Sequence, residues 1–396
     1  MTGSVTAPAA AESRAAMVER VMTDERVTGR WPAALLAPWR DALATVPRHR
    51  FVPARVYVPH PDGGRPPLVP LHRDDDPERW LRIAYGAEPP GWVVTQVDDG
   101  DPAGPDGGGV AATSSASAPA IVAAMLAALD AQPGERVCEI GTGTGYNAAL
   151  LAHQLGAERV STVEVDPVIG DAARRALRAA GYGGVRVVTG DGADGYPPGA
   201  PFDRLVATVA PREIPPAWIA QTRPGGRVVV PYRNDYTGAL VALTVGEDGT
   251  ATGPVVDDAA FMWMRADREP GADSIGGDEE VAAAERTVGD LHPYWIGGDR
   301  GAQFAIGQWV PDCQHRYEPD GDGDALWLLD FRSRSWAKIE HHDRDAGTFP
   351  VLQYGPRRLF DEARRAHAWW VDHDRPGIER WQFTVTAGGQ RIALAE

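Results

Sequence analysis

The chain has 396 residues, of which 43% are hydrophobic and 24% are charged, and its formal net charge is −16. This composition is typical of a soluble globular protein with two domains, and the acidic balance argues against nonspecific nucleic-acid binding while accommodating a basic peptide. No run approaches the roughly 18 apolar residues that a membrane span needs. The opening "MTGSVTAPAAAESRAA" has no apolar signal core, so we expect a cytoplasmic protein without a membrane anchor.

Cysteine and histidine spacing predicts neither a disulfide nor a metal site. Cys138 and Cys313 lie far apart, and Cys138 falls inside an expected buried strand. His341 and His342 are adjacent and lack further ligand-type spacing. We therefore expect no metal. The sequence leaves the oligomeric state open, with a monomer as the favoured interpretation.

The N-terminal part predicts helices followed by a long excursion. Residues 15–46 are typical of helices interrupted by prolines, and "VPRHRFVP" follows them, where Arg48, His49 and Arg50 either attract an acidic substrate or form a solvated turn. Residues 59–109 are rich in Pro, Gly and Asp, and an insertion of this length usually covers a functional site or lacks order. The aromatic and β-branched residues of "PERWLRIAYG" and "GWVVTQVDDG" favour partial order.

Between residues 137 and 232, short β-branched runs alternate with helix-like stretches, as in "VCEI", "NAALLAHQL", "VSTVEV" and "PVIGDAARRALRAA". This alternation predicts parallel βαβ units and a doubly wound α/β sheet, with the ligand at the carboxyl ends of the strands. We expect two further strands, 240–246 and 259–265, to finish the sheet with an antiparallel pair.

The first strand ends in Glu139 and leads into a loop with glycine at every second position, "GTGTG". Glycines let the backbone turn tightly and let a ligand approach closely. The third glycine comes one residue too early for the dinucleotide fingerprint G-x-G-x-x-G, and an acid precedes the loop. This combination favours S-adenosylmethionine over a nicotinamide dinucleotide, because Glu139 can reach the α-ammonium group of that cofactor directly or through water.

Two more acids follow the next strands in the chain. Glu164 ends "STVEV" and can accept hydrogen bonds from both ribose hydroxyls, while Asp191 in "TGDG" can accept one from the adenine amino group. Three acids at three successive strand ends together predict a cofactor site. The remaining residues that we expect to bind the cofactor are Gly141, Thr142, Gly143, Gly145, Asn147, Val165 and Gly192.

The C-terminal part predicts a separate small domain. Residues 266–289 are typical of a linker that contains a helix, and the tail 290–396 holds seven of the thirteen tryptophans. That density is sufficient to nucleate an α+β core, and an aromatic peptide-binding face is the alternative. The expected organisation is therefore a catalytic domain at 1–265, the linker, and a tryptophan-rich domain at 290–396 for recognition of a peptide substrate.

Four blocks resemble the protein L-isoaspartate O-methyltransferases, in the order of that family. They are "VPRHRFVP", "SAP" ahead of "IVAAML", "CEIGTGTGYNAALLA" and "FDRLVATVAPREIPPAWIAQTRPGGRVVVPY". The resemblance covers about residues 15–265. It implies a Rossmann-like, seven-stranded class I methyltransferase sheet, S-adenosylmethionine as methyl donor and a carboxylate as acceptor.

Two departures from the family pattern indicate a narrower group. The excursion 59–109 intervenes between the first two blocks, and the chain continues for about 130 residues past the expected sheet. Both additions, with "TSSASAP", are similar to actinobacterial methyltransferases associated with ribosomally made, modified peptides, of the ATP-grasp-cyclised and lanthipeptide types. That resemblance implies methylation of an aspartate in a cyclised precursor peptide and closure of the ester to a succinimide, leaving ester, succinimide and isoaspartate open as final products.

Methyl transfer to a carboxylate needs positioning and removal of water, because the acceptor is already ionised at neutral pH. Hydroxyl groups suit this task, so we expect Ser117, with Ser115 or Thr113, to hold the acceptor carboxylate. Ser117 precedes a helix that begins at proline, so capping of that helix is the structural alternative. Such a site needs no general base.

Three other functions remain alternatives. A general isoaspartate repair enzyme shares the reaction but acts on any damaged protein, and the two added segments argue against so open a site. A noncatalytic peptide-binding protein that retains the cofactor fold is opposed by the intact acids and Ser117. A nicotinamide oxidoreductase is opposed by the glycine spacing.

Overall fold

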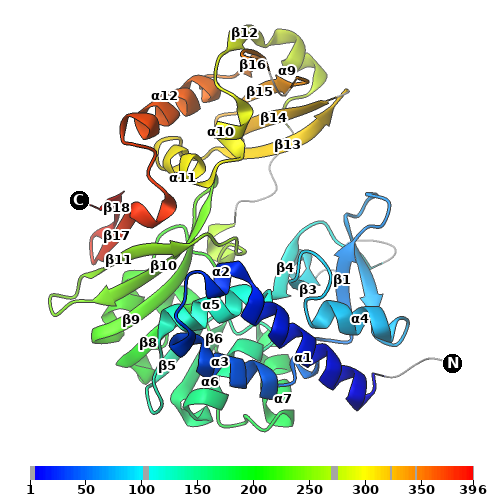
Figure 1. Ribbon diagram of the computed structural model, residues 1–396, viewed down its shortest axis with the longest axis vertical. Coiled ribbons are helices and arrows are strands. Elements are labelled where there is room, and N and C mark those ends of the chain that lie inside the picture. Colours follow the sequence, from blue (N-terminus) through cyan, green and yellow to red (C-terminus); the bar gives the residue numbers. More distant parts are fainter. Residues whose placement is uncertain (1–4, 101–106, 269–274, 322, 344–345, 396) are drawn as a thin grey trace.

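The computed structural model describes residues 5–100, 107–268, 275–321, 323–343 and 346–395. Within these ranges the chain forms a nine-stranded central sheet, a four-stranded sheet beside it and a five-stranded C-terminal sheet (Figure 1). None of the described helices combines the length and apolar character needed to cross a bilayer. Short 3-10 helices link the larger elements at η1 (Arg48–Arg50), η2 (Asp98–Gly100), η3 (Ala157–Arg159), η4 (Gly192–Asp194), η5 (Pro197–Gly199), η6 (Arg265–Asp267) and η7 (Ile378–Arg380).

The central sheet has the order β18-β17-β11-β10-β9-β8-β5-β6-β7. The side from β9 to β7 is parallel, as the alternation of strands and helices predicts, and β10 and β11 continue the sheet in antiparallel register. Six of the seven strands expected from the sequence are present, β11 takes the place of the seventh, and two more from the C-terminus extend the sheet. The seven are β5 (Val137–Ile140), β6 (Val160–Glu164), β7 (Arg186–Thr189), β8 (Phe202–Ala207), β9 (Thr222–Arg233), β10 (Gly238–Val245) and β11 (Ala251–Asp257).

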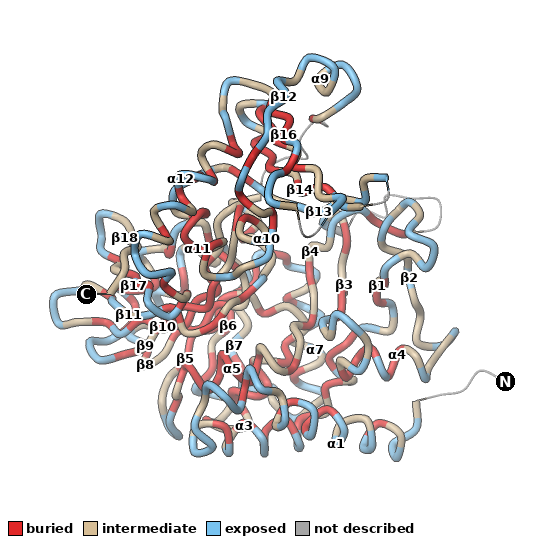
Figure 2. Tube along the Cα trace, turned by 45° about the horizontal axis from the view of Figure 1, so that its top comes forward, coloured by how far each residue is buried: buried red, intermediate tan, exposed pale blue. Residues whose placement is uncertain are grey.

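Helices cover the central sheet and bury its apolar strands. Helix α5 is apolar on nearly every side and is buried over most of its length, so it lies inside the molecule rather than on its surface. Figure 2 shows the buried segments concentrated in the strands of the central sheet, with exposed loops around them. The helices are α1 (Ala7–Thr23), α2 (Glu25–Thr28), α3 (Ala33–Thr45), α5 (Pro119–Leu129), α6 (Tyr146–Leu155), α7 (Pro167–Ala179) and α8 (Pro216–Ala220).

The expected strand at 259–265 is wrong. The antiparallel partner of β10 is β11, whose sequence "ATGPVVD" hides its role because Gly253 and Pro254 are poor strand formers. Gly253 is required there, since a Cβ atom would lie 1.9 Å from the Ala242 carbonyl oxygen. The aromatic stretch that resembles a strand instead crosses the carboxyl end of β8, where Ala210 exchanges backbone hydrogen bonds with Met262 and Met264.

The excursion is ordered in both places where the sequence predicts order. Its strands β2 and β3 pair with β1 and β4, which flank it in sequence, in an antiparallel sheet of order β2-β1-β3-β4, with helix α4 beside the sheet. "PERWLRIAYG" supplies α4 and "GWVVTQVDDG" supplies β3, while residues 101–106 lie outside the described part. The elements are β1 (Arg55–Pro59), β2 (Leu68–His72), α4 (Pro77–Ala84), β3 (Val93–Val97) and β4 (Ala112–Ala116).

The C-terminal part is an α+β unit with strand order β12-β16-β15-β14-β13. Its first strand lies inside the stretch expected to be a linker. Trp336, Trp370 and Trp381 are buried in hydrophobic cores, whereas Trp309 is 56% exposed. The elements are α9 (Asp278–Ala283), β12 (Glu285–Gly289), α10 (Pro293–Gly297), α11 (Arg300–Trp309), β13 (Gln314–Asp320), β14 (Gly323–Asp330), β15 (Ser335–His341), β16 (Phe349–Tyr354) and α12 (Leu359–Asp372).

The last hairpin returns to the central sheet. It consists of β17 (Trp381–Thr386) and β18 (Gly389–Leu394), and β17 pairs in antiparallel register with β11. Phe383 is fully buried, and its ring centroid lies 4.9 Å from that of Tyr232 on β9. The tail therefore completes the core of the central sheet as well as forming its own sheet.

We expect Phe383→Ala to lower the free energy of unfolding by about 3–5 kcal/mol, because it removes a fully buried aromatic ring and leaves a cavity. Urea unfolding followed by tryptophan fluorescence and far-UV circular dichroism measures the change. The exposed neighbour Gln382 gives a matched control, and Gln382→Ala should shift stability by about 0.5 kcal/mol or less. Equal stability of the two variants would show that the hairpin contributes nothing to the core of the central sheet.

Candidate functional site

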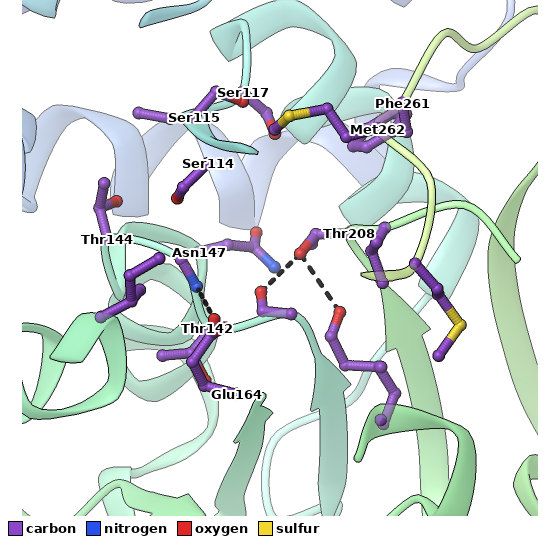
Figure 3. Close-up of a pocket in the computed structure, with 18 of the residues that line it drawn as sticks. Ser114, Ser115, Ser117, Thr142, Thr144, Asn147, Glu164, Thr208, Phe261 and Met262 are labelled. Carbon is purple, nitrogen blue, oxygen red and sulfur yellow. Dashed lines mark hydrogen bonds between the residues drawn. The ribbon is translucent and has the colours of Figure 1, made fainter. Parts of the chain in front are cut away.

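A pocket of about 570 Å³ opens at the carboxyl ends of β5, β6 and β8. Its walls come from the β4 to α5 connection, the glycine loop, the segments after β6, β7 and β8, and residues 260–268. Figure 3 shows Ser117, Phe261 and Met262 at one end and Glu164 at the other, with Thr208 and Asn147 between them. Every residue that the sequence predicts for the site lines this pocket except Gly145.

The glycine loop takes a backbone path that other residues rarely adopt. Gly141, Gly143 and Gly145 have φ values of +92°, +51° and +83°. A Cβ atom on Gly141 would lie 2.7 Å from Oγ1 of Thr208, the residue after β8. This close approach also requires glycine at position 141. Gly145 is the N-cap of α6 and packs against α7, which explains why it lies behind the pocket wall. The loop thus holds main-chain atoms, rather than side chains, against the cavity.

Glu139 is fully buried at the end of β5. One carboxylate oxygen accepts a hydrogen bond from Asn147 Nδ2 at 2.7 Å, and the other accepts one from Thr162 Oγ1 at 2.6 Å. Burial raises the pKa of Glu139 to about 7, against the opposing effect of these hydrogen bonds. The side chain therefore lies near its ionisation point at neutral pH.

Glu164 ties the end of β6 to the glycine loop. Its carboxylate accepts hydrogen bonds from the backbone amides of Gly143 at 2.9 Å and Asp166 at 3.1 Å. Burial raises its pKa, and those two amide hydrogen bonds oppose the rise. A carboxylate has about four lone-pair positions, so both oxygens keep the capacity to accept from a ligand hydroxyl.

The third acid differs from the first two because it is exposed. Asp191 follows β7, lines the pocket and accepts a hydrogen bond from the Ala193 amide at 2.9 Å. Next to it, Gly192 lies against Ile140, since a Cβ atom there would be 2.6 Å from Ile140 Cγ2. Val165 is 43% exposed at the pocket rim. These residues give the cavity a mixed apolar and acidic wall.

The hydroxyl residues before α5 divide into bonded and free groups. Thr113 Oγ1 donates to Gln96 Oε1 at 3.0 Å, and Ser114 Oγ accepts from Thr95 Oγ1 at 3.1 Å. Ser115 and Ser117 line the pocket, and their hydroxyls form no hydrogen bond with the described residues. The N-cap of α5 is Ala118, without a side-chain cap, so the capping role considered for Ser117 is wrong.

Arg48 is not part of a solvated turn, which corrects that interpretation, and its attraction of an acidic substrate stays a prediction. It is fully buried, and its guanidinium donates to the backbone carbonyls of Ala84, Ala116 and Ser117 at 2.7–3.2 Å. It also lies 4.9 Å from the ring centroid of Tyr146. Arg48 therefore fixes the main chain beside Ser117, while Arg50 stays exposed.

Residues 261–268 are the part of the site that the sequence interpretation missed, because the stretch resembles a strand. Arg265 pairs with Asp99 of the excursion at 3.2 Å and with Asp166, the N-cap of α7, at 3.3 Å. Arg268 pairs with the same Asp99 at 3.0 Å and donates to the Thr113 carbonyl at 3.2 Å. This network joins the excursion to the segments beside the central sheet at the pocket wall. The signal available in the sequence was the pair Arg265 and Arg268 directly after the aromatic run "FMWM".

The fold is that of a class I methyltransferase. A solved protein-L-isoaspartate O-methyltransferase structure aligns with a TM-score of 0.52 over 97% of this chain and 100% of its own, at 18% identity, which shows the fold alone. The family model for protein-L-isoaspartate(D-aspartate) O-methyltransferase matches residues 108–267.

Sequence comparison then gives the family. The Gloeobacter violaceus protein-L-isoaspartate O-methyltransferase is 40% identical over 190 residues, which are 48% of this chain and 71% of that protein. The Ignicoccus hospitalis enzyme is 41% identical over 127 residues, 32% of this chain and 60% of its own length. The chain belongs to the protein-L-isoaspartate O-methyltransferase family, and it spans about 60% of the length of the Ignicoccus relative.

The pKa of Glu139 predicts a pH-dependent stability. With a pKa of about 7 in the folded chain and an ordinary value of 4.5, the folded state holds the proton more tightly. The stability that the protonated group contributes is full below pH 4.5 and is lost as pH rises through 7, by up to about 3 kcal/mol. Glu139→Gln should remove that loss.

Urea unfolding of both proteins between pH 5 and pH 8 measures the difference. We expect the variant to become more stable relative to the wild type as the pH rises, with most of the change complete by about pH 8. Parallel stability curves over that range would show that Glu139 ionises at an ordinary pKa.

Proposed function

We propose that this chain is an S-adenosylmethionine-dependent O-methyltransferase that methylates a carboxylate of a peptide or protein. The observation that carries the proposal is the single pocket in which the glycine loop and three acids meet the free hydroxyls of Ser115 and Ser117. The names of the relatives support the reaction type.

The residues present fit this cofactor. Gly141 and Gly143 leave space that a Cβ atom would occupy, and Glu164 has acceptor capacity at the end of β6 for the ribose hydroxyls. Glu139, just before the glycine loop, and Asn147, in the first turn of α6 after it, would hold the amino acid portion, and Asp191 would accept a hydrogen bond from the adenine amino group. The acids also complement the positive charge of the sulfonium and ammonium groups.

When bound, the cofactor supplies a methyl group that a carboxylate oxygen takes as the carbon–sulfur bond breaks, the sulfur keeps the electron pair, and no proton moves. The chain's residues hold the acceptor in line and keep water away. Arg48 fixes the Ser117 main chain, so that the Ser117 hydroxyl has a defined position at the pocket end opposite Glu164. Trp92 of the excursion lines the same pocket and is 42% exposed, which leaves its ring available to a substrate.

The finer proposal is that the acceptor is an aspartate in a cyclised ribosomal peptide, leading to a succinimide. Support comes from the excursion, which contributes Trp92 to the pocket wall and whose strand β3 pairs with the pocket-lining strand β4. Among described residues the pocket lining stops at Arg268, so a peptide-recognition role of the tail would lie outside the pocket. Repair of isoaspartyl proteins is the second candidate, because the family match covers the site-bearing residues 108–267.

We expect Glu164→Ala to weaken S-adenosylmethionine binding about ten- to a hundredfold, because two ligand hydroxyls lose a charged acceptor. Isothermal titration calorimetry measures the dissociation constant. Glu247 lies in the exposed turn after β10, so Glu247→Ala removes the same charge away from the pocket and should leave binding unchanged. Unchanged affinity in a folded Glu164→Ala protein would remove this residue from the site.

We expect Ser117→Ala to lower methyl transfer about tenfold or more, with cofactor affinity and thermal stability unchanged, because Ser117 caps no helix. The assay follows methyl ester formation by mass spectrometry on a cyclised aspartyl peptide, its linear form and a short isoaspartyl peptide. Ser13→Ala on α1 is the matched control.

A preference of the wild type for the cyclised peptide supports the finer proposal. Efficient methylation of the isoaspartyl peptide alone supports repair. Cofactor binding without transfer to any of the three contradicts both proposals.

A further inference from the structure

Four of the described arginines line the pocket, and three of them already have partners. Arg265 and Arg268 form ion pairs with Asp99. Arg48 forms no ion pair with a described residue, but it is fully buried, and its Nε and Nη2 donate to three backbone carbonyls while Nη1 has no hydrogen-bond partner. Arg233, the last residue of β9, forms no ion pair with any described residue. Its single hydrogen bond in the described part runs from one Nη to the Phe261 carbonyl at 3.1 Å. Its charge is therefore available to a ligand.

The neighbouring acid does not neutralise Arg233. Asp235, two residues along the chain, accepts hydrogen bonds from both Nη atoms of Arg212, at 2.6 and 3.3 Å. Arg212 and Arg233 both lie over the ring of Trp263, 4.7 and 4.9 Å from its centroid. Trp263 is itself held by its backbone bridge to Ala210. The ring of Trp263 thus orients Arg233, and no carboxylate of the described residues pairs with its guanidinium.

The guanidinium of Arg233 also has unused donors. It carries five N–H groups in a planar fork that matches a carboxylate, and the described residues take one of them. None of its nitrogen atoms is among the buried atoms without a partner, so the remaining donors reach solvent. Desolvation lowers the pKa of Arg233, against the opposing field of Asp235, yet an arginine stays charged at neutral pH.

Arg233 lies at the acceptor end of the pocket. It donates to Phe261, and Figure 3 shows Phe261 and Met262 beside Ser117, away from Glu164. Glu139, Glu164 and Asp191 line the pocket around the proposed cofactor position. The two ends therefore carry opposite charge, which suits a cationic methyl donor at one end and an anionic acceptor at the other.

We propose that Arg233 binds the carboxylate of the peptide that accepts the methyl group, an inference that rests on the proposed function. A carboxylate held by the free edge of the guanidinium would lie beside the Ser117 hydroxyl. Methylation converts that anion into a neutral ester, which loses the charge–charge attraction to Arg233. The same contact thus selects an acid over an amide and favours release of the ester.

The test compares the wild type with Arg233→Gln, Arg233→Lys and the control Arg186→Gln, which removes a charge from an exposed position on β7. The probes are the acceptor peptide with the highest wild-type turnover and its counterpart with a carboxamide in place of the acceptor carboxylate. Their dissociation constants are measured by calorimetry in the presence of S-adenosylhomocysteine, whose own affinity reports that each variant is folded.

We expect the wild type and Arg186→Gln to bind the carboxylate peptide about ten- to a hundredfold more tightly than the carboxamide peptide. Arg233→Gln should bring this ratio close to one and lower kcat/KM by a similar factor, with S-adenosylhomocysteine affinity within about twofold of normal. Arg233→Lys should lie between them, because lysine keeps the charge and loses the fork.

If Arg233→Gln keeps the wild-type ratio of the two dissociation constants, the inference is overturned. Equal loss of affinity for the carboxylate and carboxamide peptides also overturns it, because Arg233 would then contact another group of the substrate. Failure of the wild type to methylate any peptide would contradict the proposed function instead, before any variant is compared.

Discussion

The site depends on the hydrogen bond between the Gly143 amide and the Glu164 carboxylate, 2.9 Å long. It joins the loop after β5 to the end of β6, two parallel strands whose register already brings their carboxyl ends together. The positive φ values of the loop and the close approach of Thr208 at Gly141 permit that contact only with glycine. Acid, loop and sheet edge are thus one structural unit, and the pocket forms around it.

Charge is distributed along the pocket in a way that matches the proposed reaction. Burial raises the pKa values of Glu139 and Glu164, and the pKa of Glu139 reaches about 7. Ionising these carboxyl groups in the cavity therefore lowers the stability of the fold. A cationic ligand would offset that cost. At the other end Arg233 presents a positive charge without a carboxylate partner, while Arg265 and Arg268 pair with two acids, Asp166 and Asp99.

The added segments contribute in different ways. The excursion reaches the pocket through Trp92, and Asp99 binds it to residues 265–268 beside the central sheet through two arginines. None of the described residues of the tail lines the pocket. Its strand β17 nevertheless pairs with β11, and Phe383 packs against Tyr232. Removal of the whole tail would therefore expose the core of the catalytic sheet, and point variants are the sharper probes of its role.

The sequence by itself determined the parallel sheet, the glycine loop and the three acids, because strand periodicity, glycine spacing and strand-end positions are local properties of the chain. It also indicated order at "PERWLRIAYG" and "GWVVTQVDDG", which form α4 and β3.

Three features required the tertiary structure. Phe261 to Met264 have the composition of a strand, but β11 occupies the place beside β10, so they line the pocket. Arg48 looks like a surface residue until three distant carbonyls surround it. The free charge of Arg233 follows from the capture of Asp235 by Arg212 and of Asp99 by Arg265 and Arg268, contacts between residues up to 169 positions apart that no local pattern encodes.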